Sequence, residues 1–220
     1  MIMMAVIGLI NVSGFIHAWK AQWYDGAISV LSFVCTLAFA PHLDKGIMVG
    51  VVLSLGVFLY KSMRPTVSTL SRCEDTALRN AMTHGLAECR YIGMIRFEGP
   101  LFFASASYLE DQINDRLQER PDLRHLVIVA NGINDMDASG EESLSLVIDT
   151  VRAKGLDISF SGINDTVMDV IKRTHLYEKI GVENIYPTME EAICAVHENA
   201  HDRSEETACP LTDVCHLPAA

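Results

Sequence analysis

The chain has 220 residues, a mass of 24.3 kDa and a formal net charge of −11, and half of its residues are hydrophobic. Its positive mean hydropathy of +0.22 argues against a disordered chain and against a purely soluble one. Charge is divided unevenly, because residues 1–65 carry a net +2 and residues 66–220 a net −13. The acidic second part lacks the basic surface that phosphate backbones require, which excludes nucleic acid as a partner.

Three stretches without a charged residue precede residue 62, at residues 1–16, 27–40 and 46–60. They lack the polar face that a surface helix of a soluble protein repeats every 3.6 residues. The second and third are shorter than the ~20 residues of a lone membrane span, so we expect membrane helices packed as a hairpin. The alternatives are buried helices of a soluble core and, for residues 1–18, a secretory signal peptide. The signal peptide is disfavoured by the missing basic n-region and cleavage site.

Basic residues indicate how these helices are oriented. Lys20 follows the first stretch, and Lys61 and Arg64 follow the third. Because cytoplasmic loops are enriched in Lys and Arg, we expect residues 17–26 and everything after residue 61 to lie in the cytoplasm, at the inner cell membrane. The first stretch would then start on the far side of the membrane, which is typical of the C-terminal part of a longer protein.

The sequence predicts four parts. Residues 1–65 form the transmembrane part, residues 66–88 are a polar, linker-like segment, residues 89–200 form a small α/β domain, and a tail follows. Alternating strands and helices indicate a mainly parallel sheet covered by helices. Strands are expected at residues 91–97, 101–103, 124–130 and 157–161, and helices at residues 106–119, 140–153, 165–174 and 189–199, the last capped by Thr188. Residues 201–220 have no periodicity and predict a flexible tail.

The segment most informative about function joins a buried strand to a helix, at residues 133–142. Ser139 is followed three residues later by Glu142, the spacing of a capping box, and a cap is the simplest role for this serine. A helix N-terminus also attracts anions, so Ser139, Asp137 and Gly140 form the candidate regulatory, phosphorylation or anion-binding site. Phosphate on Ser139 would add charge beside acidic neighbours and could expel a bound partner.

These residues resemble a known family. The strand, the sequence Asp137-Ala138-Ser139-Gly140 and the helix resemble the STAS domain, which anti-sigma-factor antagonists share with the cytoplasmic tails of SulP-family anion transporters. Residues 96–106, with a Gly-Pro turn and two aromatic residues, look like the first hairpin of a SulP tail. Residues 46–65 look like the last membrane helix running into that tail, and the resemblance extends to about residue 197.

The resemblance implies that the chain is the C-terminal portion of a secondary active transporter for sulfate or another inorganic anion, with a regulatory STAS domain. The family's anion site lies in earlier membrane helices, so the anion is a partner of the full-length transporter only, and no anion ligand is assigned here. Ser139 matches the serine phosphorylated in the sigma-regulatory relatives, and Asp137 matches the acid two residues before it. The other partners expected are the lipid bilayer, a homodimer mate and a cytoplasmic regulatory protein.

The alternative is a membrane-tethered STAS module that binds a partner protein, is regulated at Ser139 and has no transport activity of its own. An enzyme is not expected, because the sequence has no Gly-rich phosphate loop, HExxH motif or convincing Ser/His/Asp set. Some thiols and imidazoles near the chain end could ligate a metal: Cys209, Cys215 and His216, with His197 and His201 nearby. Their spacing fits no zinc pattern, so we expect reduced thiols, no metal and no cofactor.

Overall fold

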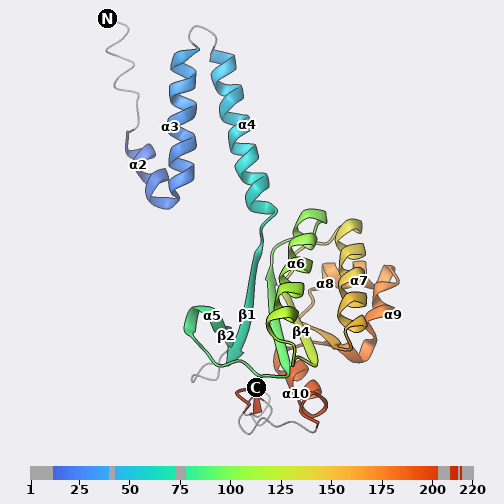
Figure 1. Cartoon of the computed structure of the whole chain (residues 1–220). Coiled ribbons are helices and arrows are strands. Elements are labelled where there is room, and N and C mark those ends of the chain that lie inside the picture. Colours follow the sequence, from blue (N-terminus) through green and yellow to red (C-terminus); the bar gives the residue numbers. More distant parts are fainter. Residues whose placement is uncertain (1–11, 40–42, 73–77, 203–208, 213, 215–220) are drawn as a thin grey trace, which may run out of the picture. The chain divides into compact units, whose positions relative to one another are not determined.

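The computed structural model describes residues 12–39, 43–72, 78–202, 209–212 and 214. The chain divides into two compact units, residues 1–61 and residues 62–220, and each is described by itself. Figure 1 labels their helices and strands. The described part of the first unit is helical, whereas the second contains a sheet.

The described helices of the first unit are α2 (Val12–Ala21), α3 (Trp23–Ala38) and α4 (Leu43–Ser62). Small residues let α3 and α4 approach closely. A Cβ atom on Gly46 would lie only 2.4 Å from the Cα of Thr36, and one on Gly50 only 2.3 Å from the Oγ of Ser32. Glycines four residues apart permit this kind of backbone approach between apolar helices in membranes.

Among the described residues, α4 is the one helix long and apolar enough to cross a membrane, over Asp44–Ser62, judged by its length and composition. A shorter apolar helix, Gly26–Ala38, lies within α3. The second and third apolar stretches of the sequence therefore fold as helices, as expected. Most of the first stretch, residues 1–11, lies outside the described residues.

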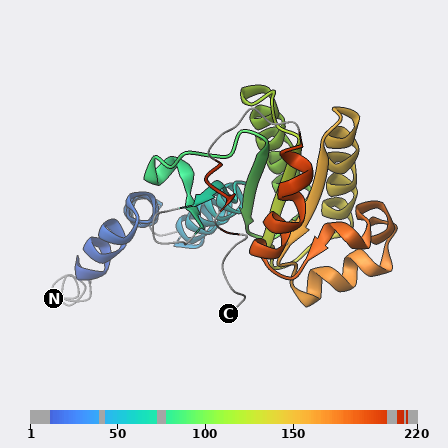
Figure 2. The ribbon, with the colours of Figure 1, turned by 90° about the horizontal axis from the view of Figure 1, so that it is seen from below.

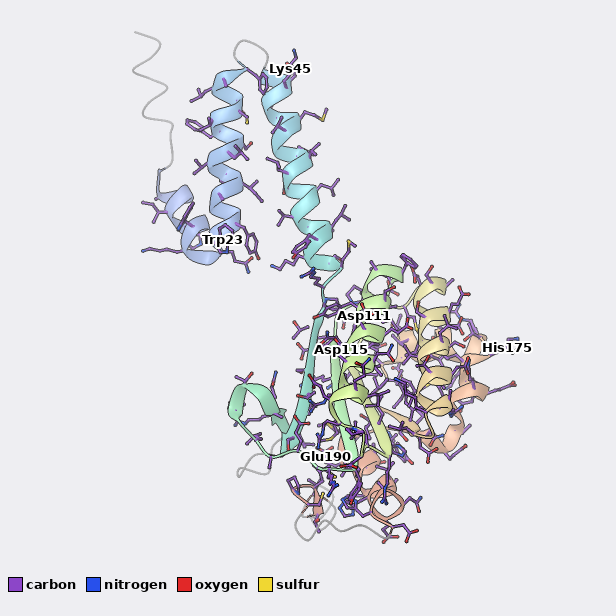
Figure 3. The ribbon with its side chains drawn as sticks, viewed as in Figure 1. Trp23, Lys45, Asp111, Asp115, His175 and Glu190 are labelled. Carbon is purple, nitrogen blue, oxygen red and sulfur yellow. The ribbon has the colours of Figure 1, made fainter. Side chains whose placement is uncertain are left out.

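The apolar side chains of these helices are largely exposed within the unit. Val51 and Phe58 on α4 expose 57% and 65% of their surface. The ends of the helical pair carry amphipathic or charged groups, with Trp23 at one end and Lys45 at the other (Figure 3). At the Trp23 end, the Lys61 ammonium donates a hydrogen bond to the Gln22 side chain at 3.2 Å. Contiguous exposed apolar surface of this kind marks contact with lipid or with further protein.

The second unit is built on a six-stranded sheet with the strand order β2-β1-β3-β4-β5-β6. Strands β3 to β6 are parallel to their neighbours, whereas β1 is antiparallel to both β2 and β3. The strands are β1 (Thr66–Arg72), β2 (Leu78–Asn80), β3 (Ile92–Glu98), β4 (His125–Gly132), β5 (Asp157–Ser161) and β6 (Ile185–Tyr186). The mainly parallel α/β sheet expected from the sequence is confirmed.

Helices cover both faces of this sheet. Because side chains alternate along a strand, Leu126 and Ile128 of β4 enter one hydrophobic core, with α6 to α9, while Val127 and Val129 enter a second core, with α10 (Figures 1 and 2). The helical elements of this unit are α5 (Ala81–His84), α6 (Phe103–Glu119), α7 (Ala138–Ala153), α8 (Asp165–Arg173), α9 (Leu176–Ile180), the 3₁₀ turn η1 (Val182–Asn184) and α10 (Met189–Ala200). Thr188 caps α10, as expected, by accepting a hydrogen bond from the Glu191 N–H.

Two segments that the sequence predicts to be irregular belong to the fold. The expected linker, residues 66–88, contains β1 and β2, and β1 pairs with β3 through residues 66–69 and with β2 through residues 70–72. The expected flexible tail, residues 201–220, contains Leu211 and Val214, which are 0% and 4% exposed and lie in the same core as α10. Both segments are polar overall, which is why their periodicity is weak.

The expected strand at residues 101–103 is also wrong. Leu101 makes only an isolated bridge with Met136, and Phe103 already starts α6. The aromatic residues after the Gly-Pro turn do not enter the core, because Phe102 and Phe103 expose 37% and 69% of their surface. The first hairpin of this unit is formed by β1 and β2 instead.

His125, at the start of β4, is a buried histidine with a consequence for stability. Its Nε2 lies 2.8 Å from the Ser159 hydroxyl. Burial lowers the pKa of His125 from its ordinary 6.5, because the cation loses hydration, and the Asp157 carboxylate opposes this only in part. With a lowered folded-state pKa, the stability contributed by neutral His125 is complete above pH 6.5 and declines as the pH falls from there toward the folded-state pKa.

We therefore expect His125→Gln to flatten the loss of stability on acidification. The free energy of unfolding should fall less steeply than in the native chain, by up to about 1.4 kcal/mol per pH unit. Urea denaturation followed by circular dichroism between about pH 7 and about pH 5 measures this difference. His175→Gln is the matched control, because His175 is exposed (Figure 3). Equal slopes for the native chain and His125→Gln would contradict the expectation.

Candidate functional site

The loops that follow β3 and β4 meet at the carboxyl edge of the sheet. The Gly99 N–H donates to the Gly132 carbonyl at 2.9 Å, and the Leu101 N–H donates to the Asp135 carbonyl at 2.8 Å. These backbone bonds tie the start of α6 to the start of α7. The loop after β3 therefore fixes the position of the segment that contains Ser139. This segment lies at the edge of the sheet where parallel α/β proteins commonly carry their functional residues.

Asp137, not Ser139, caps α7. Its backbone is extended, its Oδ1 accepts a hydrogen bond from the Gly140 N–H at 2.7 Å, and its carbonyl accepts one from the Glu141 N–H at 2.9 Å. The capping box expected from Ser139 and Glu142 is therefore wrong. Aspartate and serine are both good N-caps, and the 3.4 Å hydrogen bond from the Asp137 N–H to the Leu101 carbonyl fixes which of them lies at the helix entrance.

With Asp137 as the cap, the Ser139 side chain has no hydrogen-bond partner in the part of the chain that the structure describes. Ser139 is half-buried in the first turn of α7, and its hydroxyl makes no hydrogen bond with any residue that the structure describes. Its neighbours Asp137 and Glu142 are exposed. Since Asp137 already uses the Gly140 N–H, the helix end offers a free anion fewer donors than an uncapped one would. The geometry therefore favours modification of Ser139 over binding of a free anion.

Gly140 is required by close backbone contact. A Cβ atom at this position would lie 2.0 Å from the Leu101 carbonyl oxygen and 2.8 Å from the Leu101 carbonyl carbon. Residues 133–142 thus combine a cap at Asp137, an unpartnered hydroxyl at Ser139 and a packing requirement at Gly140. The three residues singled out in the sequence lie together, but each has a different physical role.

The comparison with protein families decides what kind of domain carries this site. Residues 86–192 match the family model of the STAS domain. This segment is similar to STAS domains, and its mainly parallel α/β fold is STAS-like. The α/β fold expected from the resemblance is therefore confirmed.

Similarity to known transporters extends beyond the STAS domain. The chain is 24% identical to Probable sulfate transporter 4.2 of Arabidopsis thaliana, over 94% of this chain and 32% of the relative, and 25% identical to Sulfate transporter 3.2 of the same plant, over 95% and 34%. It spans about a third of the length of these curated relatives. The resemblance to the C-terminal portion of a SulP-family transporter with its STAS domain is confirmed.

The fold of the chain is also found in a solved transporter structure. The murine Slc26a9 anion transporter in its inward-facing state matches 86% of this chain and 31% of its own, with a TM-score of 0.73 and 21% sequence identity. At this identity the likeness concerns the fold. The match extends beyond the STAS domain, because that domain alone occupies only residues 86–192.

A second cluster of reactive side chains lies elsewhere in the same unit as the STAS domain. Cys89, His201 and Cys209 bring one ligand atom each to within 4.8 Å of the others. The pKa of the Cys209 thiol is lowered from its ordinary value to about 5, chiefly because the Cys89 thiol hydrogen-bonds to it, while the pKa of Cys89 is raised by the same hydrogen bond and by burial. Cys209 and His201 were predicted from the sequence as possible ligands, whereas Cys89 carried no local signal, and Cys215 and His216 lie outside the described residues.

Proposed function

We propose that the chain is the C-terminal portion of a secondary active transporter for sulfate or a related inorganic anion, and that its STAS domain is cytoplasmic and regulatory. The observation that carries this proposal is the order of parts in one chain. Apolar helices with exposed side chains precede a STAS domain, and named sulfate transporters align with 94% of the chain. The relatives named here are transporters, which favours transport over enzymatic activity.

Membrane attachment is the first test of this proposal. After cell lysis without detergent, we expect the full chain in the membrane pellet, resistant to high salt and released by detergent, because α4 exposes apolar side chains along its length. Residues 62–220 expressed alone are the matched control and should stay in the supernatant, since that unit gathers most of its apolar side chains into two cores. Full chain in the supernatant would overturn the proposal.

Transport itself is tested by comparing two polypeptides in lipid vesicles. The chain alone should give no uptake of labelled sulfate above empty vesicles, because the family's anion site is formed by earlier membrane helices. The chain joined to the coding sequence upstream of it should give uptake. Uptake by the chain alone, or an upstream sequence that encodes no membrane helices, would count against the proposal. The second result would favour a stand-alone membrane-tethered module.

That alternative, a tethered STAS module that binds a partner protein and is regulated at Ser139, is favoured by two observations. The Ser139 hydroxyl has no partner among the described residues, and exposed Phe102 and Phe103 lie next to Leu101, whose backbone contacts Gly140. Regulation at Ser139 is compatible with either function. Mass spectrometry of the chain from its native cells should find phosphate on the peptide containing Ser139. Complete absence of phosphate under all growth conditions would contradict this regulatory role.

A further inference from the structure

Three sulfur and nitrogen ligands converge from distant parts of the chain. Cys89 precedes β3, His201 is the C-terminal cap of α10, and Cys209 belongs to the segment that returns to the sheet after α10. Their ligand atoms all lie within 4.8 Å of one another, and the Cys89 Sγ is 3.4 Å from the His201 Nε2. Cys89 is buried, while His201 and Cys209 are half-buried. The cluster therefore lies at the boundary of the second core.

The imidazole of His201 is oriented as in metal sites. Its Nδ1 lies 2.9 Å from the His197 carbonyl oxygen, one turn earlier on α10. A carbonyl oxygen can only accept, so Nδ1 carries the proton and donates it. The Nε2 is then the unprotonated nitrogen, and its lone pair faces the Cys89 sulfur. A backbone carbonyl that fixes the tautomer in this way is the usual outer-shell partner of a metal-binding histidine.

Both sulfur atoms accept hydrogen bonds from the backbone. The Ile92 N–H donates to the Cys89 Sγ at 3.3 Å, and the Leu211 N–H donates to the Cys209 Sγ at 3.4 Å. Such bonds stabilise the negative charge of a thiolate and fix the direction of its remaining lone pairs. The thiolate is the form of cysteine that binds metals.

The distance between the Cys89 sulfur and the His201 nitrogen matches two corners of a tetrahedral zinc site. Zinc lies about 2.3 Å from a cysteine sulfur and about 2.0–2.1 Å from a histidine nitrogen, so that two such ligands on adjacent tetrahedral corners are about 3.5 Å apart. The observed separation of 3.4 Å between the Cys89 Sγ and the His201 Nε2 fits this value. Two thiolates and an imidazole form a soft donor set that selects zinc over calcium or magnesium.

We propose that Cys89, His201 and Cys209 bind one Zn²⁺ ion, which fastens the segment after α10 to the start of β3. His197 is the candidate fourth ligand. Its ring stacks nearly parallel on that of His201, with centroids 4.2 Å apart, so the ring would have to turn for its buried Nε2 to reach the same ion. The ion would hold in place the segment that carries Leu211 and Val214 into the core.

The test uses the full chain purified in detergent with reductant. Elemental analysis should find one zinc per chain. Replacement by Co²⁺ should produce thiolate-to-cobalt charge-transfer absorption together with the visible bands of tetrahedral cobalt. Cys209→Ser and His201→Asn should each weaken zinc binding by more than about 100-fold, since changes in outer-shell partners alone cost about 10–100-fold. Removal of zinc with a chelator should lower the melting temperature of the native chain but not that of Cys209→Ser.

Cys194→Ser is the matched control, because Cys194 is a half-buried thiol on the same helix, α10, but outside the cluster. It should keep the zinc content and the cobalt spectrum of the native chain. The proposal is overturned if the chain holds no zinc and gives no thiolate–cobalt absorption, or if Cys194→Ser loses the metal as Cys209→Ser does. A disulfide between Cys89 and Cys209 in chain isolated from cells with its thiols blocked would also overturn it.

Discussion

Replacing Gly140 by alanine is expected to destabilise the STAS domain by about 2–3 kcal/mol, and valine should cost more. The added Cβ would lie 2.0 Å from the Leu101 carbonyl oxygen, which is backbone and cannot rotate away. The first turn of α7 must therefore shift and strain the hydrogen bonds that join the loops after β3 and β4. The gain in helix propensity from glycine to alanine, about 1 kcal/mol, offsets only part of this cost.

Chemical denaturation of the full chain, followed by far-ultraviolet circular dichroism, measures this loss. Tryptophan fluorescence cannot report it, because both tryptophans, Trp19 and Trp23, lie in the first unit. Ser139→Ala and Ser139→Asp are the matched controls one residue away. They should change stability by no more than about 0.5 kcal/mol, since the Ser139 hydroxyl makes no hydrogen bond with a described residue and Asp137 provides the cap. A large loss for Ser139→Asp, or none for Gly140→Ala, would contradict the geometry described for this turn.

Truncating the second unit to residues 88–200 is expected to cause the largest loss of stability. This fragment lacks β1, and with it Leu70, and it also lacks Leu211 and Val214. Each of these side chains is buried, and burial of such a side chain contributes about 1.5–3 kcal/mol. The loss should therefore be at least about 4 kcal/mol relative to residues 62–220. Removing β1 also leaves β3 as an exposed, largely apolar edge, which favours aggregation.

Expression of both fragments from the same vector, with comparison of soluble yield and of urea midpoints, measures this difference. Residues 62–200, which keep β1 but lack the last segment, separate the two contributions. This fragment should be intermediate in stability. Equal stability of residues 88–200 and 62–220 would mean that β1 and the last segment do not belong to the cooperative unit.

Much of the fold could be predicted from periodicity because the central elements bury their side chains in a regular pattern. β5 lies at residues 157–161, as expected, and β4 and α10 differ from expectation only at their ends. A helix with one apolar face repeats its pattern about every 3.6 residues, and a strand with one apolar face repeats it every two. Buried strands are also marked by runs of β-branched residues, so such elements are recognisable from the sequence. The family resemblance rested on the same central segment, around Ser139, and on the apolar helices.

The peripheral elements could not be predicted in this way. β1 has the sequence TVSTLSR, whose mostly polar residues give no clear strand pattern, although β1 lies between β2 and β3 in the sheet. The cap of α7 was equally ambiguous from the sequence, because aspartate and serine are both favoured N-cap residues. The hydrogen bond from the Asp137 N–H to the Leu101 carbonyl determines that Asp137 is the cap.

The sequence by itself therefore determined the division into an apolar basic part and an acidic α/β part, since composition and periodicity are local properties. Only the tertiary structure decided the cap of α7, the inclusion of β1 and the meeting of Cys89 with His201 and Cys209. The physical reason is the same for all three. Each depends on contacts between residues far apart in the chain, and Cys89 and His201 are separated by 112 positions. Such a contact cannot be predicted from the spacing of residues along the sequence.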